Sequence, residues 1–137
     1  MATPKLTEQI GYLIARANRM IEEDLAKRLS ANGVTIEPYR VLKSLKEEGP
    51  LPMGRLAERV LVEPATLTKI IDRMVGETLV FRIPDEKDRR KVRVSLTEAG
   101  VAMCRQLEAI GDDHEQHITD TLGAGDLADV LRRLRTH

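Results

Sequence analysis

The chain has 137 residues whose 22 basic and 22 acidic side chains cancel, with 42% hydrophobic and only 2% aromatic residues. This length is typical of one domain with one modest core, and a core of aliphatic side chains favours helices over a β-sandwich. The single cysteine excludes an intrachain disulfide. The N-terminus has no signal-peptide pattern and no apolar run is long enough to span a bilayer, so we expect a cytoplasmic protein with no membrane partner.

The first part of the chain is predicted to be helical. Apolar residues recur at three- and four-residue steps from Ile10 to Leu29, which indicates a long amphipathic helix, and Gly33 follows as a stop. Thr35 is in a position to cap a second helix, which Gly49 ends.

Two short helices joined by a tight connection come next. The first spans roughly Gly54 to Val60, and Pro64 begins the second because proline suits the first turn of a helix. The second helix has an apolar stripe that consists of Leu67, Ile70, Ile71 and Met74. Its opposite, polar face consists of Ala65, Thr68, Lys69 and Asp72, flanked by Thr66 and Arg73.

After Leu79 the hydrophobic period changes from helical to alternating, which predicts a β-hairpin with a polar tip from Pro84 to Lys91. On its second strand Val92, Val94 and Leu96 are expected to face in, and Arg93 and Ser95 to face out. Between Arg82 and Arg93 there are six basic and three acidic residues, so positive charge is concentrated here although the total is zero.

The remaining chain predicts two more helices. Thr97 to Gly100 opens one of them, and its apolar stripe consists of Met103, Leu107 and Ile110. The last helix is marked by Leu127, Val130, Leu131 and Leu134. No linker or repeat divides the chain.

The order of helix, short turn, helix and basic hairpin is the one that major-groove recognition requires. An α-helix fits a groove about 12 Å wide, and a hairpin reaches the adjacent backbone or minor groove. Ala65 allows close approach, while Thr66 and Thr68 can bond base edges or phosphates. Lys69 and Arg73 can reach guanine acceptors or phosphates. On these residues alone, the polar face can equally read DNA or be only a solvated helix surface.

The hairpin also resembles a family signature. The run from Asp88 to Thr97, DRRKVRVSLT, is similar to the D-x-R-x-x-x-V-x-L-T pattern of MarR-type (multiple antibiotic resistance) transcription regulators, and Gly100 follows at the usual place. The segments Leu56–Arg59 and Thr66–Met74 resemble the family's L-A-E-x segment and recognition helix. The family commonly has glycine where this chain has Thr78.

The resemblance implies a mainly α-helical winged helix-turn-helix with a small β-hairpin wing. Residues 1–137 would form a single domain in which about 35–97 bind DNA and 6–32 and 98–137 are dimerisation helices. The implied protein is a homodimer that binds a pseudo-palindromic operator in double-stranded DNA, acting as a ligand-responsive repressor or, less often, an activator. Two-fold symmetry and the few bases that one module reads agree with this arrangement. No cofactor is expected.

The implied DNA contacts lie in two groups. The recognition-helix residues are Ala65, Thr66, Thr68, Lys69 and Arg73. The wing residues are Asp88, Arg89, Arg90, Lys91 and Arg93, of which Arg90 occupies the family position that enters the minor groove. Asp88 can orient Arg90 through a charge-assisted bond. The alternative for the basic run is a solubilising loop.

An effector pocket is expected between the DNA-binding and dimerisation parts, and Tyr39 is predicted to line it, although Tyr39 can equally be a core residue. A winged helix that binds an acidic protein is the main alternative function. No converging acid, base and nucleophile set is visible, so an enzyme is not expected.

Three residues invite sensing roles. His114 and His117 are three apart rather than four and have no evident third ligand, so they are interpreted as surface histidines with no metal, although a regulatory metal site with nearby acids stays open. Cys104 lies near an apolar stripe and is interpreted as a small buried hydrophobe, with redox sensing as the alternative.

Overall fold

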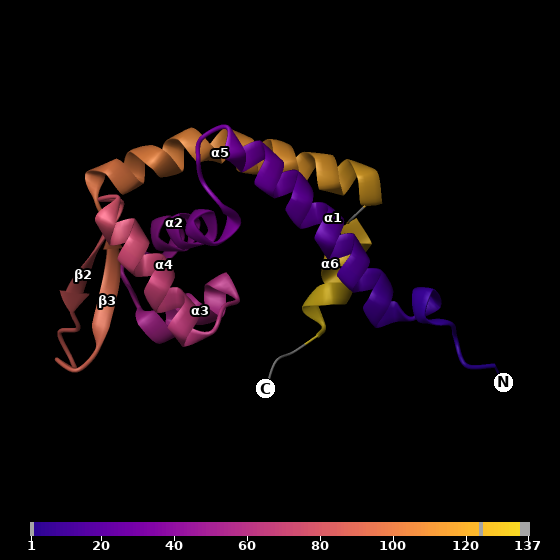
Figure 1. Ribbon diagram of the computed structural model, residues 1–137, viewed down its shortest axis with the longest axis horizontal. Coiled ribbons are helices and arrows are strands. Elements are labelled where there is room, and N and C mark those ends of the chain that lie inside the picture. Colours follow the sequence, from indigo (N-terminus) through magenta and orange to yellow (C-terminus); the bar gives the residue numbers. More distant parts are fainter. Residues whose placement is uncertain (1, 124, 135–137) are drawn as a thin grey trace.

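A computed structural model describes residues 2–123 and 125–134 of the chain. The long helix α5 (Glu98–Leu122) runs along one side of the molecule and joins two groups of elements (Figure 1). Under one end lie α2 (Ile36–Glu48), α3 (Met53–Val60), α4 (Pro64–Gly76) and the strands; under the other lie η1 (Leu6–Glu8), α1 (Ile10–Ser30) and α6 (Gly125–Arg132). Within the described residues, no helix is long and apolar enough to cross a membrane.

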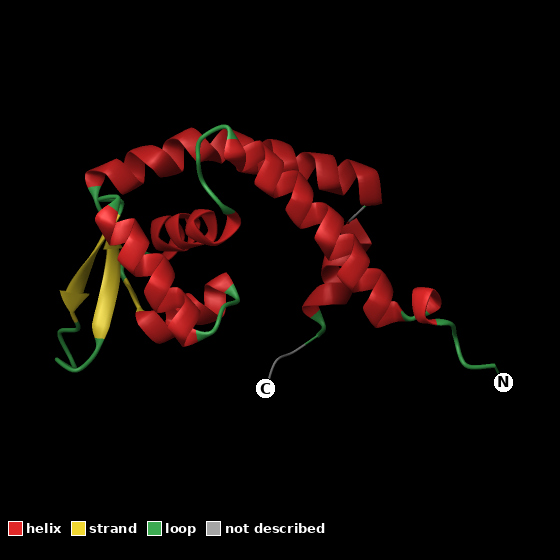
Figure 2. Cartoon of the chain, in the orientation of Figure 1, coloured by secondary structure: helices red, strands yellow, loops and turns green. Residues whose placement is uncertain are grey.

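The strands form a small antiparallel sheet at one end of an otherwise helical molecule (Figure 2), which confirms the expected fold class. The predicted hairpin consists of β2 (Val80–Pro84) and β3 (Val92–Leu96). A third strand, β1 (Leu51–Pro52), pairs with the other side of β3 and was not predicted, because two residues are too short to show alternation.

The expected inward face of the hairpin is correct only at its base. Val94 is fully buried, but Val92 is 36% exposed because the hairpin extends beyond the core towards its tip. Arg93 and Ser95, expected to face out, are half-buried.

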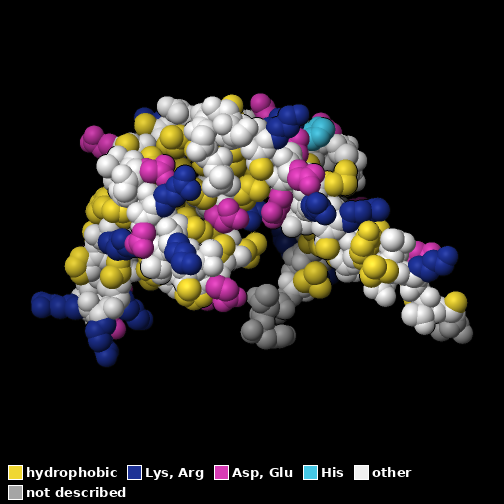
Figure 3. Space-filling model, in the orientation of Figure 1, with side chains coloured by type: hydrophobic (Ala, Val, Ile, Leu, Met, Phe, Trp, Pro, Cys, Tyr) yellow, Lys and Arg dark blue, Asp and Glu magenta, His cyan; other side chains and the backbone are white. Residues whose placement is uncertain are grey.

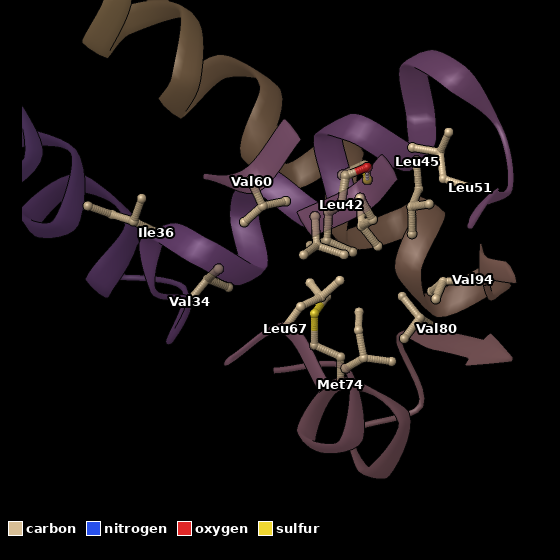
Figure 4. Packing of buried hydrophobic residues seen from close by; sticks show 14 of the residues in the cluster. Val34, Ile36, Leu42, Leu45, Leu51, Val60, Leu67, Met74, Val80 and Val94 are labelled. Carbon is tan, nitrogen blue, oxygen red and sulfur yellow. Dashed lines mark hydrogen bonds between the residues drawn. The ribbon is translucent and has the colours of Figure 1, made fainter. Parts of the chain in front are cut away.

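The core formed by α2, α3, α4 and the sheet is completed within the chain. Leu42 and Leu45 of α2, Val60 of α3, and Leu67 and Met74 of α4 point toward one another (Figure 4). The predicted stripe of α4 is confirmed: Leu67 and Ile71 are fully buried, Met74 is nearly so, and Ile70 packs against them. Burial of one large aliphatic side chain stabilises a fold by about 1.5–3 kcal/mol, so this stripe holds α4 in place.

Three threonines lie at the helix ends and turns that border the sheet and α2. Helix α5 begins where expected, and Thr97 caps it: the Thr97 hydroxyl accepts a 3.0 Å hydrogen bond from the Gly100 N–H. The same hydroxyl donates a 2.6 Å bond to the Thr78 carbonyl. Thr78 has the left-handed φ of 60°, which glycine adopts without strain and which explains the family's preference there. Thr35 occupies the cap position of α2 but its side chain makes no capping bond, so that expectation was wrong.

The other end of the molecule leaves its apolar faces uncovered. Ile10 is 71% exposed, Met20 66% and Val130 50%, although all three lie on helices. Between α1, the end of α5 and α6 lies a groove of about 340 Å³ lined almost entirely by apolar side chains. Its lining consists of Ile10, Leu13, Ile14, Ala17, Asn18, Ile21, Leu122, Leu127 and Leu131. Contiguous exposed apolar surface of this kind marks an interaction site.

His114 is buried rather than on the surface, which corrects the interpretation from sequence. Its Nδ1 lies 2.7 Å from Asp24 Oδ2 of α1, and the same carboxylate oxygen accepts a 2.8 Å bond from Arg28 Nε. The acidic neighbours of His114 suggested a solvated surface, but residues 107, 111 and 114 share the buried stripe of α5. The cluster therefore joins α1 to α5.

Asp24→Asn should lower the free energy of unfolding at neutral pH, with a difference from wild type that shrinks on acidification. The hydrogen bonds with His114 and then Arg28 hold the pKa of Asp24 below its ordinary value of 3.8. A carboxylate with a lowered pKa contributes stability that is fully present above the ordinary pKa and is lost as the pH falls through the lowered one. Denaturant unfolding over a pH series measures this.

Asp113→Asn is the matched control, because Asp113 is an exposed carboxylate on α5, next to His114 in sequence, and its loss should leave stability unchanged. Equal destabilisation of the Asp24→Asn variant at neutral and strongly acidic pH would show that the side chain matters for packing and not for its charge.

Candidate nucleic-acid interface

Helix α4 presents the predicted polar face to solvent. Ala65, Thr66, Thr68, Lys69 and Arg73 are all exposed. Pro64 occupies the first turn, where its missing N–H costs nothing. The buried stripe on the opposite side fixes the rotation of the helix, so this face cannot turn away from a bound ligand.

The side chains of this face differ in how many of their polar groups already bond within the chain. The Thr68 hydroxyl donates a 3.1 Å bond to the Pro64 carbonyl of its own helix, so its methyl group and lone pairs remain for a ligand. Arg73 Nε donates to Glu77 at 3.2 Å. Lys69 has no ion pair within residues 2–123 and 125–134. Lys69 is therefore the cation of α4 that is most available for a base or a phosphate.

The wing tip is folded by its own aspartates. Asp88 Oδ1 accepts a 3.0 Å bond from the Arg90 N–H and a 3.4 Å bond from Arg90 Nε, while the Arg90 side chain is 91% exposed. Asp85 Oδ1 likewise accepts a 2.9 Å bond from the Lys87 N–H. The basic side chains project from the end of the wing, at the lower left of Figure 3. The geometry expected for Asp88 and Arg90 is thus present.

Arg93 has a different place from the other wing residues. It lies on β3 between β1 and β2, and its Nη2 donates a 2.8 Å bond to the Pro50 carbonyl. The guanidinium therefore ties the sheet to the turn before β1. Because β1 was not visible in the sequence, neither was this partner.

Arg82 and Asp72 form a contact that sequence reasoning missed. Arg82 lies on β2, on the same face as the buried Val80, and its Nη2 makes a short ion pair with Asp72 of α4. This bond links the wing directly to the exposed side of the recognition helix. The available signal was an arginine two residues after Val80, in a strand that follows directly on a helix with an exposed aspartate.

A pocket of about 320 Å³ lies between α2 and α5. Its walls are Tyr39, Leu42, Lys43, Lys46 and Glu47 of α2, and Cys104, Leu107, Glu108 and Asp112 of α5. Lys46 and Glu108 form a short ion pair across it. Tyr39 thus lines a pocket between α2 and α5 and also packs against the core.

Cys104 was considered for a redox-sensing role, and the histidines for a metal site. Cys104 is buried, its thiol lies 3.5 Å from the Leu42 carbonyl, and burial raises its pKa, which disfavours the reactive thiolate. Within the described residues, no group of three or more His, Cys, Asp or Glu side chains is arranged to hold a metal ion.

Comparison with known proteins identifies relatives along most of the chain. The MarR family model matches residues 34–92. The multiple antibiotic resistance protein MarR of Escherichia coli is 32% identical over 120 residues, which cover 87% of this chain and 83% of that protein. The transcriptional repressor NicR of Pseudomonas putida is 29% identical over 130 residues, which cover 95% and 82% respectively.

Solved structures with a similar fold cover nearly the whole chain. A mutant of E. coli MarR complexed with operator DNA superposes with a TM-score of 0.80 at 30% identity, covering 95% of each chain. A structure of BpsR from Bordetella bronchiseptica, from work on regulation of its DNA binding by 6-hydroxynicotinic acid, gives a TM-score of 0.86 at 23% identity and covers 98% of this chain and 96% of that one. At that identity the second likeness shows the fold alone.

Asp72→Asn should weaken DNA binding by about two- to fivefold, the usual value of an exposed ion pair. Removing a negative charge near DNA would by itself tighten binding, so a loss isolates the positioning role of the bond to Arg82. Arg82→Ala should also weaken binding, and the double variant should be no worse than Arg82→Ala. Fluorescence anisotropy with a labelled duplex measures the dissociation constants.

Glu86→Gln is the matched control, since Glu86 is an exposed acid of the wing tip and its loss should tighten binding slightly. If Asp72→Asn tightened binding as Glu86→Gln does, the ion pair would have no positioning role.

Proposed function

The chain belongs to the MarR family of transcription regulators, and we propose that it regulates transcription by binding a pseudo-palindromic operator as a homodimer. In this proposal α4 enters the major groove and the wing reaches the adjacent minor groove. Residues about 35–97 read DNA, and residues 6–32 and 98–137 hold the dimer together. The protein works at the chromosome, in the cytoplasm, and has no enzymatic activity of its own.

The observation that carries the proposal is the pairing of an exposed polar helix face with a basic wing tip at the same end of the molecule. Thr66, Thr68 and Lys69 supply donors, acceptors and a methyl group for base edges. Arg89, Arg90 and Lys91 supply the charges that displace phosphate counterions. The chain has no net charge, but its basic residues are concentrated in this one contact area.

The dimer is proposed from the uncovered apolar faces at the other end. The groove between α1, α5 and α6 exposes leucines and isoleucines that a stable monomer would bury. A second copy buries this surface with two-fold symmetry, so the same residues cover each other. The two reading ends are then held apart at a fixed spacing, which a palindrome matches.

The pocket between α2 and α5 is the proposed effector site. It has an apolar interior at Leu42 and Leu107 and a charged rim that includes Lys43, and its walls are α2 of one end and α5, the helix that joins the two ends. A small molecule bound there favours one arrangement of these ends over another, and so changes DNA affinity by its differential affinity for the two. Repression relieved by a ligand is the expected behaviour.

Selection of genomic DNA fragments bound by the purified protein tests the proposal. We expect enrichment of one pseudo-palindromic sequence, and a mobility shift of that sequence that weakens steeply with salt. Failure to enrich any sequence, together with binding to an acidic protein through the same surface, would assign the winged unit to protein recognition instead.

Arg90→Ala should weaken operator binding strongly and flatten its salt dependence by up to about one counterion per subunit. An exposed guanidinium at a groove floor gains most where A·T-rich sequence narrows the minor groove, so preference for A·T flanks should fall as well. Arg90→Lys should recover only part of the loss, because ammonium is compact and strongly hydrated. Titrations at several salt concentrations measure the slope.

Arg105→Ala provides the control, because this substitution removes the same charge at an exposed position of α5, outside the proposed contact area. Its operator affinity and salt slope should match wild type. An Arg90→Ala dimer that kept wild-type affinity and slope would remove the wing from the interface.

A further inference from the structure

A tyrosine of α2 meets a glycine of α5 where these two helices pack together. Gly111 lies in the buried stripe of α5, and a methyl group added at its Cα would overlap the hydroxyl oxygen of Tyr39 on α2. The Cζ atom of the same ring would be 3.2 Å from that methyl group. The missing side chain at position 111 is therefore what allows the two helices to lie at this distance.

The tyrosine cannot easily turn aside. In a helix only two χ1 rotamers are common, and the ring of Tyr39 is half-buried and packed against the core. The same ring forms a wall of the pocket between α2 and α5. Whatever occupies that pocket touches the residue that spaces the two helices.

Helix α2 is fixed to α3, α4 and the sheet by side-chain contacts, so these elements move together with it. Arg59 of α3 donates to Glu47 and Glu48 of α2 at 3.0 and 3.1 Å. Leu42 and Leu45 share the core with α4 and the sheet. Helix α5 instead continues to the other end of the molecule, where His114 is bonded to α1. A change in the spacing of α2 and α5 therefore moves the recognition helix relative to the dimerisation end.

We propose that Tyr39, seated against Gly111, is the positioning contact through which the pocket sets the placement of the recognition helices. The inference rests on the proposed function and adds the residue pair that couples its two sites. In the seated state the spacing between the two copies of α4 fits the operator. Displacement of the ring by a ligand, or by a side chain at position 111, separates α2 from α5 and spoils that spacing.

A double-mutant cycle tests this with the full-length dimer and the selected operator. Gly111→Ala should weaken operator binding about tenfold, within the usual range of allosteric coupling. Binding to random DNA at low salt should stay unchanged, because the basic wing is intact and non-specific binding does not depend on half-site spacing. In the Tyr39→Phe background, where the overlapping oxygen is gone, the same Gly111→Ala change should cost less than about threefold.

Thermal unfolding gives a second readout that needs no DNA. The overlap with the Tyr39 hydroxyl opposes the helix preference of alanine, so Gly111→Ala should lower the melting temperature clearly more with Tyr39 present than in the Tyr39→Phe background. Gly54→Ala in α3, where an added methyl group meets nothing within 4 Å, shows the effect of helix propensity alone.

The outcomes separate the two claims. A wild-type protein that selects no operator contradicts the proposed function, whereas the melting cycle still tests the contact. If Gly111→Ala bound the operator as wild type does, or lost equal affinity with and without the Tyr39 hydroxyl, the positioning role would be wrong.

Discussion

Apolar side chains are buried completely at one end of this molecule and incompletely at the other, and the rest of the structure depends on this difference. At one end α2, α3, α4 and the sheet enclose a core that the chain completes by itself, with Leu56 and Leu67 fully buried. At the other end α1 and α6 diverge and leave Ile10 and Leu131 exposed. The first end can therefore hold the exposed face of α4 in a fixed position. The second end buries its apolar faces only when another surface covers them. Helix α5 belongs to both, which makes it the part through which one end can affect the other.

Acidic residues at the reading end organise the basic ones. Asp88 holds Arg90, Asp72 holds Arg82, and Glu77 lies beside Arg73. Each carboxylate reduces the local positive charge, yet each also restricts an arginine that otherwise has many rotamers, so less entropy is lost when DNA binds. The neutral total charge of the chain is thus compatible with a DNA-binding surface, because position matters here more than quantity.

The periodic parts of the fold were predictable from sequence and the non-periodic contacts were not. The stripe of Leu67, Ile71 and Met74 predicted both the burial of α4 and its exposed face, and the D-x-R pattern predicted the pairing of Asp88 with Arg90. Strand β1 was missed because two residues show no period, and with it the bond from Arg93 to Pro50. The residues named as DNA contacts remain a proposal.

Burial of His114 was missed for a related reason. The sequence around it is acidic, but its burial depends on where α1 crosses α5, and that crossing is set by contacts between residues ninety positions apart. The proximity of Tyr39 to Gly111 is likewise a property of helix packing that no local pattern encodes. Sequence patterns indicate which residues face inward, whereas their particular partners follow from the tertiary arrangement.

A second copy of the chain is central to the proposed function, because it closes the apolar groove and presents two reading ends together. Sedimentation equilibrium of the protein alone and with its selected operator measures this directly. We predict a dimer with no folded monomer at micromolar concentration, and a complex of two chains per operator. A folded monomer that binds the operator as a single chain would contradict this function.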